Sequence, residues 1–219
     1  AMTVDVEDYF HVEAATGRLP REQWEALPQR VEASTDRILG ILAEFSTRAT
    51  FFVLGWVAKR QPQLVRRIAE QGHEVASHGE SHQMIHRLSP DGLLSELHDS
   101  RRRLEDLVGR PVRGFRAPTF SVTRQTAWAL DLLAEAGYVY DSSVFPLHHD
   151  RYGVPDAPPG PHWAVGPGGG RVLEIPPLTF RLLGMNVPVG GGGYMRLLPV
   201  PLVAWGLRTA QRQRRARRR

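Results

Sequence analysis

The chain has 219 residues, of which 42% are hydrophobic and 23% charged, a composition that fits one large α/β domain or two small ones and argues against whole-chain disorder. Cysteine is absent, so disulfides, thiolate metal sites and cysteine nucleophiles are excluded. The net charge of +5 is concentrated in residues 211–219, which hold six arginines and are interpreted as a solvated basic tail. Because the rest of the chain is near neutral, we expect no specific nucleic-acid partner.

Strand-like runs alternate with helical patterns over the first 140 residues. The strands are predicted at 2–6, 48–54, 73–77, 112–116 and 138–141. The helices are predicted at 35–45 with Ser34 or Thr35 as cap, at 63–71 after Pro62, from Ser89 to Gly109, and from Thr123 to Gly137. Short apolar strands that alternate with helices indicate parallel βαβ units, and periodicity leaves an open sheet and a barrel as alternatives.

The sequence changes character from residue 146 onward. Residues 146–170 are rich in proline and glycine and predict a long surface loop, which is followed by a strand at 172–175 and the glycine run Gly190–Gly193. We expect a single domain over residues 1–210. The longest apolar run, Leu197 to Leu207, is shorter than the about 20 residues that a membrane-spanning helix needs. No signal peptide precedes the first strand, which with the lack of cysteine favours a cytoplasmic location, although a trimmed N-terminus would hide a leader.

Charged side chains follow the carboxyl ends of several predicted strands. They are Asp5, Glu7 and Asp8 after the first strand, His78 and His82 after the third, Arg116 at the end of the fourth and Asp141 at the end of the fifth. In α/β barrels and doubly wound sheets, ligands bind outside these strand ends. Separate elements therefore deliver these groups to one face of the molecule.

The spacing of His78 and His82 matters most, because histidines at i and i+4 can reach one ion from a single helical turn. Taken alone, the pair could equally be two surface histidines. Asp5 and Glu7 point to the same face of a strand, and a carboxylate with two histidines is a known open site for zinc. Cobalt, nickel or iron suit the same ligands. A second carboxylate would serve as general base, although a solvated acidic strand end is the alternative.

Three motifs resemble the polysaccharide deacetylase family, the NodB-homology group that forms carbohydrate esterase family four. They are Thr3–Asp8 (TVDVED), Ser77–His82 (SHGESH) and Arg116-Ala117-Pro118, in the order and rough spacing of that family. The phrases DVEDYFHVEA, FRAPTFS, YDSSVFP, HDRYGVPDAP and GGGGYMRLLP resemble a subgroup found with exopolysaccharide and exosortase loci. The resemblance extends over nearly the whole chain.

The resemblance implies an α/β fold of a particular kind, a distorted and incomplete (β/α) barrel. It also implies metal-assisted hydrolysis of an N-acetyl, sometimes O-acetyl, group on a polysaccharide, usually with zinc. Asp5 matches the general base, His78 and His82 match metal ligands, and Arg116 matches the arginine that orients the base. The Thr119 backbone N–H falls at an oxyanion donor. We assign the acidic ligand to Glu7, with Asp8 as the alternative.

The family usually supplies a late histidine, in a Leu-x-His context, as general acid, and none follows Leu197. We therefore expect that the chain lacks its C-terminal segment or that another group replaces this acid, for which His148, His149 and His162 are weak candidates. The other histidines (His11, His73, His86 and His98) are interpreted as structural or surface residues.

The expected partner is an acetylated polysaccharide or oligosaccharide, with the polymer and the oligomeric state left open. Three rival functions remain: hydrolysis of small cyclic amides, as in the same superfamily, carbohydrate binding or assembly without catalysis, and nucleic-acid binding through the arginine tail at 211–219. A sugar-binding cleft should expose aromatic side chains, for which the candidates are Tyr9, Phe10, Phe120, Trp163 and Tyr194.

Overall fold

A seven-stranded sheet forms the centre of the computed structural model, which describes residues 2–216, with side chains described as far as residue 213. In spatial order its strands are β1 (Met2–Val6), β2 (Ala49–Val53), β3 (Glu74–Ser77), β4 (Gly114–Phe115), β5 (Tyr140–Asp141), β7 (Arg171–Glu174) and β6 (His162–Val165). Neighbouring strands are parallel from β1 to β7, and β6 pairs antiparallel with β7. The carboxyl ends of β1 to β5 therefore lie along one edge, as predicted.

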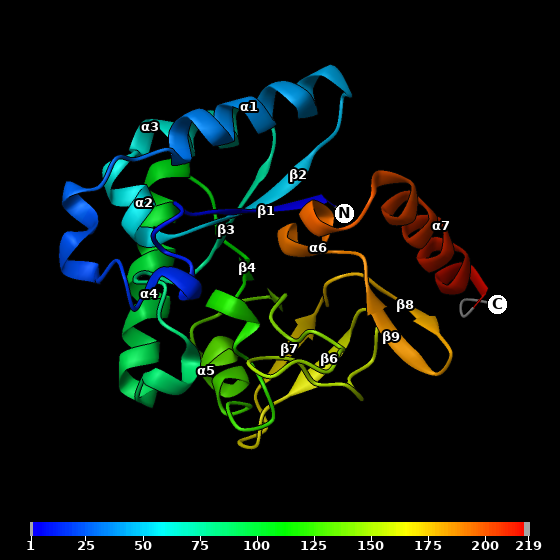
Figure 1. Cartoon of the computed structure of the whole chain (residues 1–219). Helices are drawn as coiled ribbons and strands as arrows, with labels where there is room; N and C mark the ends of the chain where they lie inside the picture. Colours follow the sequence, from blue (N-terminus) through cyan, green and yellow to red (C-terminus); the bar gives the residue numbers. More distant parts are fainter. Residues whose placement is uncertain (1, 217–219) are drawn as a thin grey trace.

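Helices cover the sheet between successive strands. They are α1 (Val31–Glu44), α2 (Gly55–Arg60), α3 (Pro62–Glu70), α4 (Pro90–Val108) and α5 (Ala129–Glu135), with 3-10 turns at Glu13–Ala15, Arg21–Ala26, Ile85–Arg87 and Pro118–Phe120. Because β1 and β6 are edge strands, the sheet stays open, and the fold is the expected incomplete α/β barrel. Figure 1 shows α1 to α4 on one side of the molecule and α7 with the β8–β9 hairpin on the other.

The predicted end signals of α4 are confirmed. The Ser89 hydroxyl accepts a hydrogen bond from the Gly92 N–H at 3.1 Å, which caps the helix after its serine–proline start. Gly109 ends the helix with φ = 66°, a left-handed conformation that glycine adopts without steric cost. Nineteen residues are thereby held as one rigid element beside β3.

Two predicted helix starts are wrong, each because a side chain satisfies backbone groups, from a distant segment in one case and locally in the other. α1 begins at Val31 and not near Ser34 or Thr35, because the Asp8 carboxylate accepts from the N–H groups of Arg30 and Val31 at 2.7 and 3.0 Å. This cap comes from a segment more than twenty residues away, which local helix signals do not include.

The helix predicted from Thr123 begins only at Ala129. The Thr126 hydroxyl accepts from the Thr123 N–H at 2.8 Å and donates to the Ser121 carbonyl at 2.7 Å. Such local side-chain bonds offer the backbone an alternative to the helix. They hold residues 121–126 as a turn.

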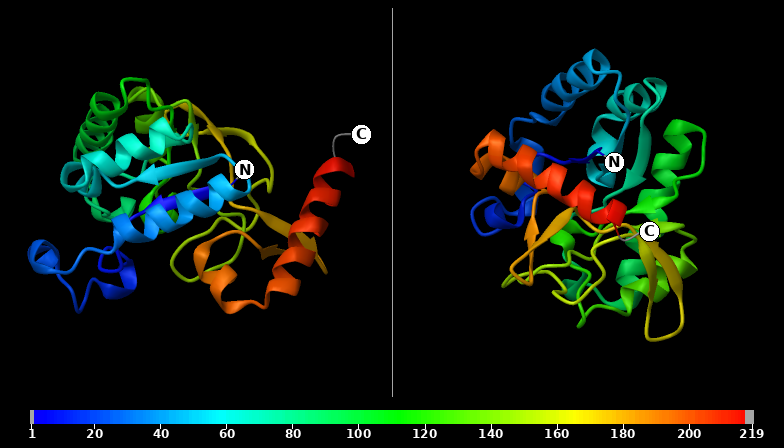
Figure 2. Two further views of the ribbon diagram at one scale, coloured as in Figure 1. Left: turned by 90° about the horizontal axis from the view of Figure 1, so that it is seen from above. Right: turned by 90° about the vertical axis from the view of Figure 1, so that its right-hand side faces the viewer.

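The C-terminal part contains more helices and strands than the sequence predicts. Strand β6 lies inside the predicted loop 146–170 and is followed by β8 (Thr179–Leu182), β9 (Met185–Pro188), α6 (Gly192–Leu197) and α7 (Val200–Ala216). Helix α7 packs against β8 and crosses the predicted boundary at residue 210. Figure 2 shows it as the long red helix next to the C-terminus. Residues 217–219 of the predicted basic tail lie outside the described part of the chain. Among residues 2–216 no helix is long and apolar enough to cross a membrane.

Most of the buried apolar side chains belong to one of two separate clusters. The large core lies between the sheet and α1 to α5 and includes Phe51, Leu64 and Leu97, all fully buried. A small core under α7 consists of Phe180, Val189 and Ala210. Since a fully buried large apolar side chain contributes about 1.5–3 kcal/mol, most of the stabilisation comes from the first core, which holds the strand ends in place.

Candidate metal and catalytic site

Glu7, His78 and His82 come together at the carboxyl edge of the sheet, as predicted from their positions after β1 and β3. One potential ligand atom from each lies within 4.8 Å of the others. The Glu7 Oε2 atom is 2.5 Å from His82 Nε2 and 4.0 Å from His78 Nε2. Both histidines are buried and Glu7 is partly buried, so these donor atoms are largely withdrawn from water.

The orientation of His78 leaves one ring nitrogen free for a ligand. Its Nδ1 lies 2.8 Å from the carbonyl oxygen of Arg116, which only accepts, so Nδ1 carries the hydrogen and Nε2 carries the lone pair. Burial lowers the pKa of His78, although Asp5 and Glu7 act in the opposite direction. The ring is therefore held neutral, which is the form that binds a metal ion.

The donor set fits a divalent transition metal. Tetrahedral zinc with ligands at about 2.0–2.1 Å keeps its ligand atoms about 3.3 Å apart, and the two distances from Glu7 Oε2 bracket that value. The same Oε2 atom is buried and makes no well-directed hydrogen bond among the described residues, although His82 Nε2 lies 2.5 Å away. A cation would satisfy this oxygen, whose burial is otherwise costly.

Asp5 is held beside this cluster by Arg116. The Asp5 Oδ1 atom accepts from Arg116 Nη1 at 2.7 Å, and the guanidinium also donates to the Ser142 carbonyl at 3.2 Å and the Ser142 hydroxyl at 2.8 Å. Burial would raise the pKa of Asp5, but the charge of Arg116, with His78 and His82, outweighs it and lowers the pKa. Asp5 is thus an ionised carboxylate in a fixed orientation.

Asp8, the alternative acidic ligand, is engaged elsewhere. Its Oδ2 accepts from the backbone N–H groups of Arg30 and Val31, and its Oδ1 accepts from the N–H of Tyr9 at 3.0 Å. Oδ2 therefore stabilises the start of α1 and Oδ1 the turn after β1, while Glu7 points to the histidines. The geometry favours Glu7 over Asp8.

Thr119 lies in a turn after β4 with an unusual backbone conformation. Its φ is 56° and that of Phe120 is 51°, both in the left-handed region that a β-branched or aromatic residue seldom adopts. Such strain costs on the order of 1–3 kcal/mol and is found mostly at functional sites. The turn is anchored where the Ala117 N–H donates to the Ser143 hydroxyl at 2.7 Å.

Asp141, the last residue of β5, takes part in a different buried group. It pairs with Glu174 across β5 and β7, both side chains are fully buried, and Ser143 donates to Asp141 Oδ1 at 2.5 Å. Burial raises the pKa of both carboxyl groups, and the charge of Asp141 raises that of Glu174 further. Asp141 supports the strand ends and is not among the groups around Glu7.

His11 was interpreted as an ordinary histidine, yet it lies close to the cluster. Its ring centroid is 6.3 Å from that of His82, in contact with the rings of Trp24 and Trp56. The Asp8 N–H donates to His11 Nδ1 at 2.7 Å, and burial lowers the pKa of His11 to about 3. Only its position four residues after Glu7 hinted at this proximity.

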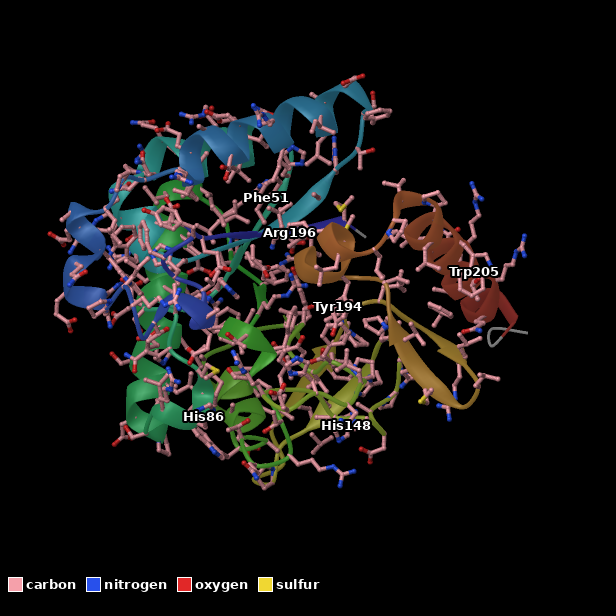
Figure 3. All side chains as sticks on the ribbon, in the orientation of Figure 1. Phe51, His86, His148, Tyr194, Arg196 and Trp205 are labelled. Atoms are coloured by element: carbon pink, nitrogen blue, oxygen red, sulfur yellow. The ribbon has the colours of Figure 1, made fainter. Side chains whose placement is uncertain are left out.

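The remaining candidates are spread over the molecule. Phe10 is buried in the core, Trp163 is 58% exposed on β6, and the Phe120 ring lies 5.5 Å from the Arg116 guanidinium. Tyr194 lies on α6 (Figure 3). Tyr9 packs against Arg30.

The three late histidines have other surroundings. His148 is exposed, His149 stacks on Tyr152 at 3.9 Å between ring centroids, and His162 Nδ1 lies 2.9 Å from the Gly160 carbonyl. None of these contacts involves the residues around Glu7.

Solved structures of similar fold include two enzymes. A putative polysaccharide deacetylase from Mycobacterium smegmatis has a TM-score of 0.62 and 28% identity, covering 80% of this chain and 57% of that one. An allantoinase has a TM-score of 0.57 and 20% identity, covering 83% and 61%, and this likeness concerns the fold alone.

Curated relatives match shorter segments. A chitooligosaccharide deacetylase from Sinorhizobium fredii is 54% identical over 48 residues, 22% of each chain. One from Bradyrhizobium sp. is 33% identical over 101 residues, 46% of this chain and 43% of that protein. A peptidoglycan-N-acetylglucosamine deacetylase from Bacillus cereus is 31% identical over 84 residues, 38% and 39%. The chain spans about half or less of the length of these relatives.

Two family models divide the chain between them. The model described as polysaccharide deacetylase matches residues 24–140, and one described as a domain of unknown function (DUF3473) matches residues 142–217. The first includes His78, His82, Arg116 and Thr119, whereas Asp5 and Glu7 precede it. Since it covers more than half of the sequence, the chain belongs to the polysaccharide deacetylase family.

Proposed function

We propose that this protein is a metal-dependent hydrolase that removes N-acetyl groups from amino sugars of a polysaccharide. The observation that carries the proposal is the convergence of Glu7, His78 and His82 next to a carboxylate, Asp5, that Arg116 holds in place. Glu7, His78 and His82 would hold the ion, zinc or another divalent transition metal. A bound ion supplies Lewis acidity and lowers the pKa of a water molecule in its coordination sphere.

Asp5 acts as general base in this proposal. Its carboxylate takes a proton from the attacking water, whose oxygen forms a bond to the acetyl carbonyl carbon. Arg116 keeps Asp5 ionised before the reaction and restricts its rotation, because the guanidinium is itself fixed by Ser142. When the C–N bond breaks, the departing amine needs a proton. Asp5 can supply the proton that it took from the attacking water.

The Thr119 backbone N–H stabilises the negative charge that develops on the acetyl oxygen. Its left-handed backbone, anchored through Ala117 and Ser143, supports this role because a fixed donor needs no reorganisation during the reaction. Losing one such donor typically costs about 3–4 kcal/mol of barrier.

The names of the relatives support an acetylated amino sugar as the substrate class of this proposal. Two of the relatives are described as chitooligosaccharide deacetylases and another as a peptidoglycan-N-acetylglucosamine deacetylase. Their shared chemistry is an acetamido group on a sugar ring, and the subgroup motifs of this chain favour an exopolysaccharide.

The first test is metal stoichiometry by elemental analysis, on the wild type and on the His78→Ala/His82→Ala variant. We expect one ion of zinc or another divalent transition metal per wild-type chain, and none in the double variant. Acetate release from N-acetylated oligosaccharides then tests the reaction, with a small cyclic amide as the comparison substrate. Absence of metal from the zinc-supplied wild type, or turnover of the cyclic amide alone, would contradict the proposal.

A further inference from the structure

The loop that carries both histidines, residues 78–82, is held from one side by a single carboxylate of α4. Glu96 Oε2 accepts hydrogen bonds from the backbone N–H groups of Glu80 and Ser81, each at 2.9 Å. Its second oxygen, Oε1, accepts from the Ser81 hydroxyl. One side chain therefore binds consecutive residues that lie between His78 and His82.

The loop needs such support because its backbone is strained. His82 has φ = 56°, and Gly79 has φ = 77°. For a residue other than glycine the left-handed conformation costs about 1–2 kcal/mol, and it persists only where surrounding contacts over-determine it. The bonds from Glu96 end at Ser81, the residue immediately before His82.

The opposite side of the loop is held by the start of α2. The N–H of Gly55 donates to the Gly79 carbonyl at 2.8 Å, and that of Trp56 donates to the Glu80 carbonyl at 3.0 Å. Helix α2 thus holds the carbonyl groups while Glu96 holds the N–H groups. The Gly79 N–H also donates to the Ser77 hydroxyl at 3.2 Å, and Arg103 binds the Glu80 carboxylate at 3.0 Å. Removing Glu96 would therefore free the N–H groups of Glu80 and Ser81, the two that lie next to His82.

We infer that Glu96 is a positioning residue for the metal site: it holds the 78–82 loop in the conformation that aims His78 and His82 at Glu7. This rests on the proposed metal-binding function, although the loop restraint itself is independent of any ion. The hydrogen bonds of Glu96 involve neither the histidine rings nor Glu7. Glu96 therefore acts on the two histidines through the loop that connects them.

Zinc affinity, measured by competition with a chromophoric chelator, tests the inference. Glu96→Ala should weaken zinc binding by about 10–100-fold, the usual effect of losing a residue that orients metal ligands. Glu96→Gln should retain more affinity, because its amide oxygen can still accept from both N–H groups. The matched control is Glu105→Ala on the same helix, which removes a carboxylate that accepts from the Val112 N–H, far along α4 from the histidine loop.

Hydrogen exchange of the metal-free proteins separates this inference from the proposed function. Glu96→Ala should speed exchange in a peptide covering residues 78–84, and Glu105→Ala should not. If the loop exchanges as in the wild type, or if a folded Glu96→Ala variant binds zinc as tightly as the wild type, the inference is wrong. If instead the wild type binds no zinc while loop exchange responds to Glu96, the proposed function fails and the loop restraint stands. Should Glu96→Ala not fold, Glu96→Gln and Ser81→Ala provide the same two measurements.

Discussion

At the scale of single residues, Asp5 and Glu7 are two positions apart and have different surroundings. Asp5 is bound to Arg116, whereas Glu7 Oε2 faces two histidine nitrogens. We predict that Asp5→Asn lowers the rate of acetate release by about 10²–10⁴-fold, the usual contribution of a general base, while one metal ion per chain is retained. The measurements are acetate release and elemental analysis. Asp36→Asn, at an exposed position on α1, serves as control, and acetate release unchanged in Asp5→Asn would disprove the assignment.

The alternative between Glu7 and Asp8 can be decided by a pair of variants. Glu7→Ala should lower zinc affinity, since it removes the oxygen nearest both histidines. Asp8→Ala should retain stoichiometric metal but lose about 0.5–2 kcal/mol of unfolding free energy, because it removes the cap of α1. The reverse pattern, with metal lost in Asp8→Ala, would identify Asp8 as the ligand.

At the scale of elements, strands and the groups that follow them were predictable, because short apolar runs and alternating periods are local signals. Asp5, His78 and Arg116 lie at strand ends in the structure as the sequence suggested. The contribution of Glu96 was not predictable, because it depends on one turn of α4 meeting a loop fifteen residues earlier. Likewise, the cap that Asp8 provides to α1 joins distant segments, which no local pattern encodes.

The carboxyl pair that joins β5 and β7 gives a prediction about pH. Burial, together with the charge of Asp141, raises the pKa of Glu174 well above its usual value of 4.5. The folded protein therefore holds a proton that the unfolded chain releases once the pH exceeds about 4.5, and the unfolding free energy falls as the pH rises toward the folded pKa. Glu174→Gln keeps a neutral group that can still accept from the Val144 N–H and does not titrate.

We therefore predict that the unfolding free energy of Glu174→Gln declines less than that of the wild type as the pH is raised above the usual carboxyl pKa of 4.5. Urea denaturation at several pH values measures both curves. Parallel curves would mean that the pair releases no proton on unfolding in this range, and the raised pKa would then be refuted.

At the scale of the whole molecule, the two separate cores suggest that α7 and the β8–β9 hairpin respond to mutation on their own. The proposed metal site lies over the large core, whereas the small core of Phe180, Val189 and Ala210 belongs to the C-terminal elements. Helix α7 reaches this hairpin at Gly206, where an added Cβ would lie 2.3 Å from Val189 Cγ1 and 3.3 Å from Phe180 Cε1. The absence of a side chain there is what permits close packing.

Gly206→Ala and Gly40→Ala form a matched pair of helix substitutions. Each should gain about 1 kcal/mol of helix propensity, and at Gly40 in α1 an added Cβ meets nothing within 4 Å, so that variant should be more stable than the wild type. At Gly206 overpacking costs about 1–3 kcal/mol, which should outweigh the gain and loosen the hairpin. Hydrogen exchange should then accelerate in residues 179–189 and 200–213 of Gly206→Ala, with zinc stoichiometry unchanged. If Gly206→Ala instead also lost its metal, the two cores would be coupled, and the C-terminal elements would have to be counted as part of the support of the metal site.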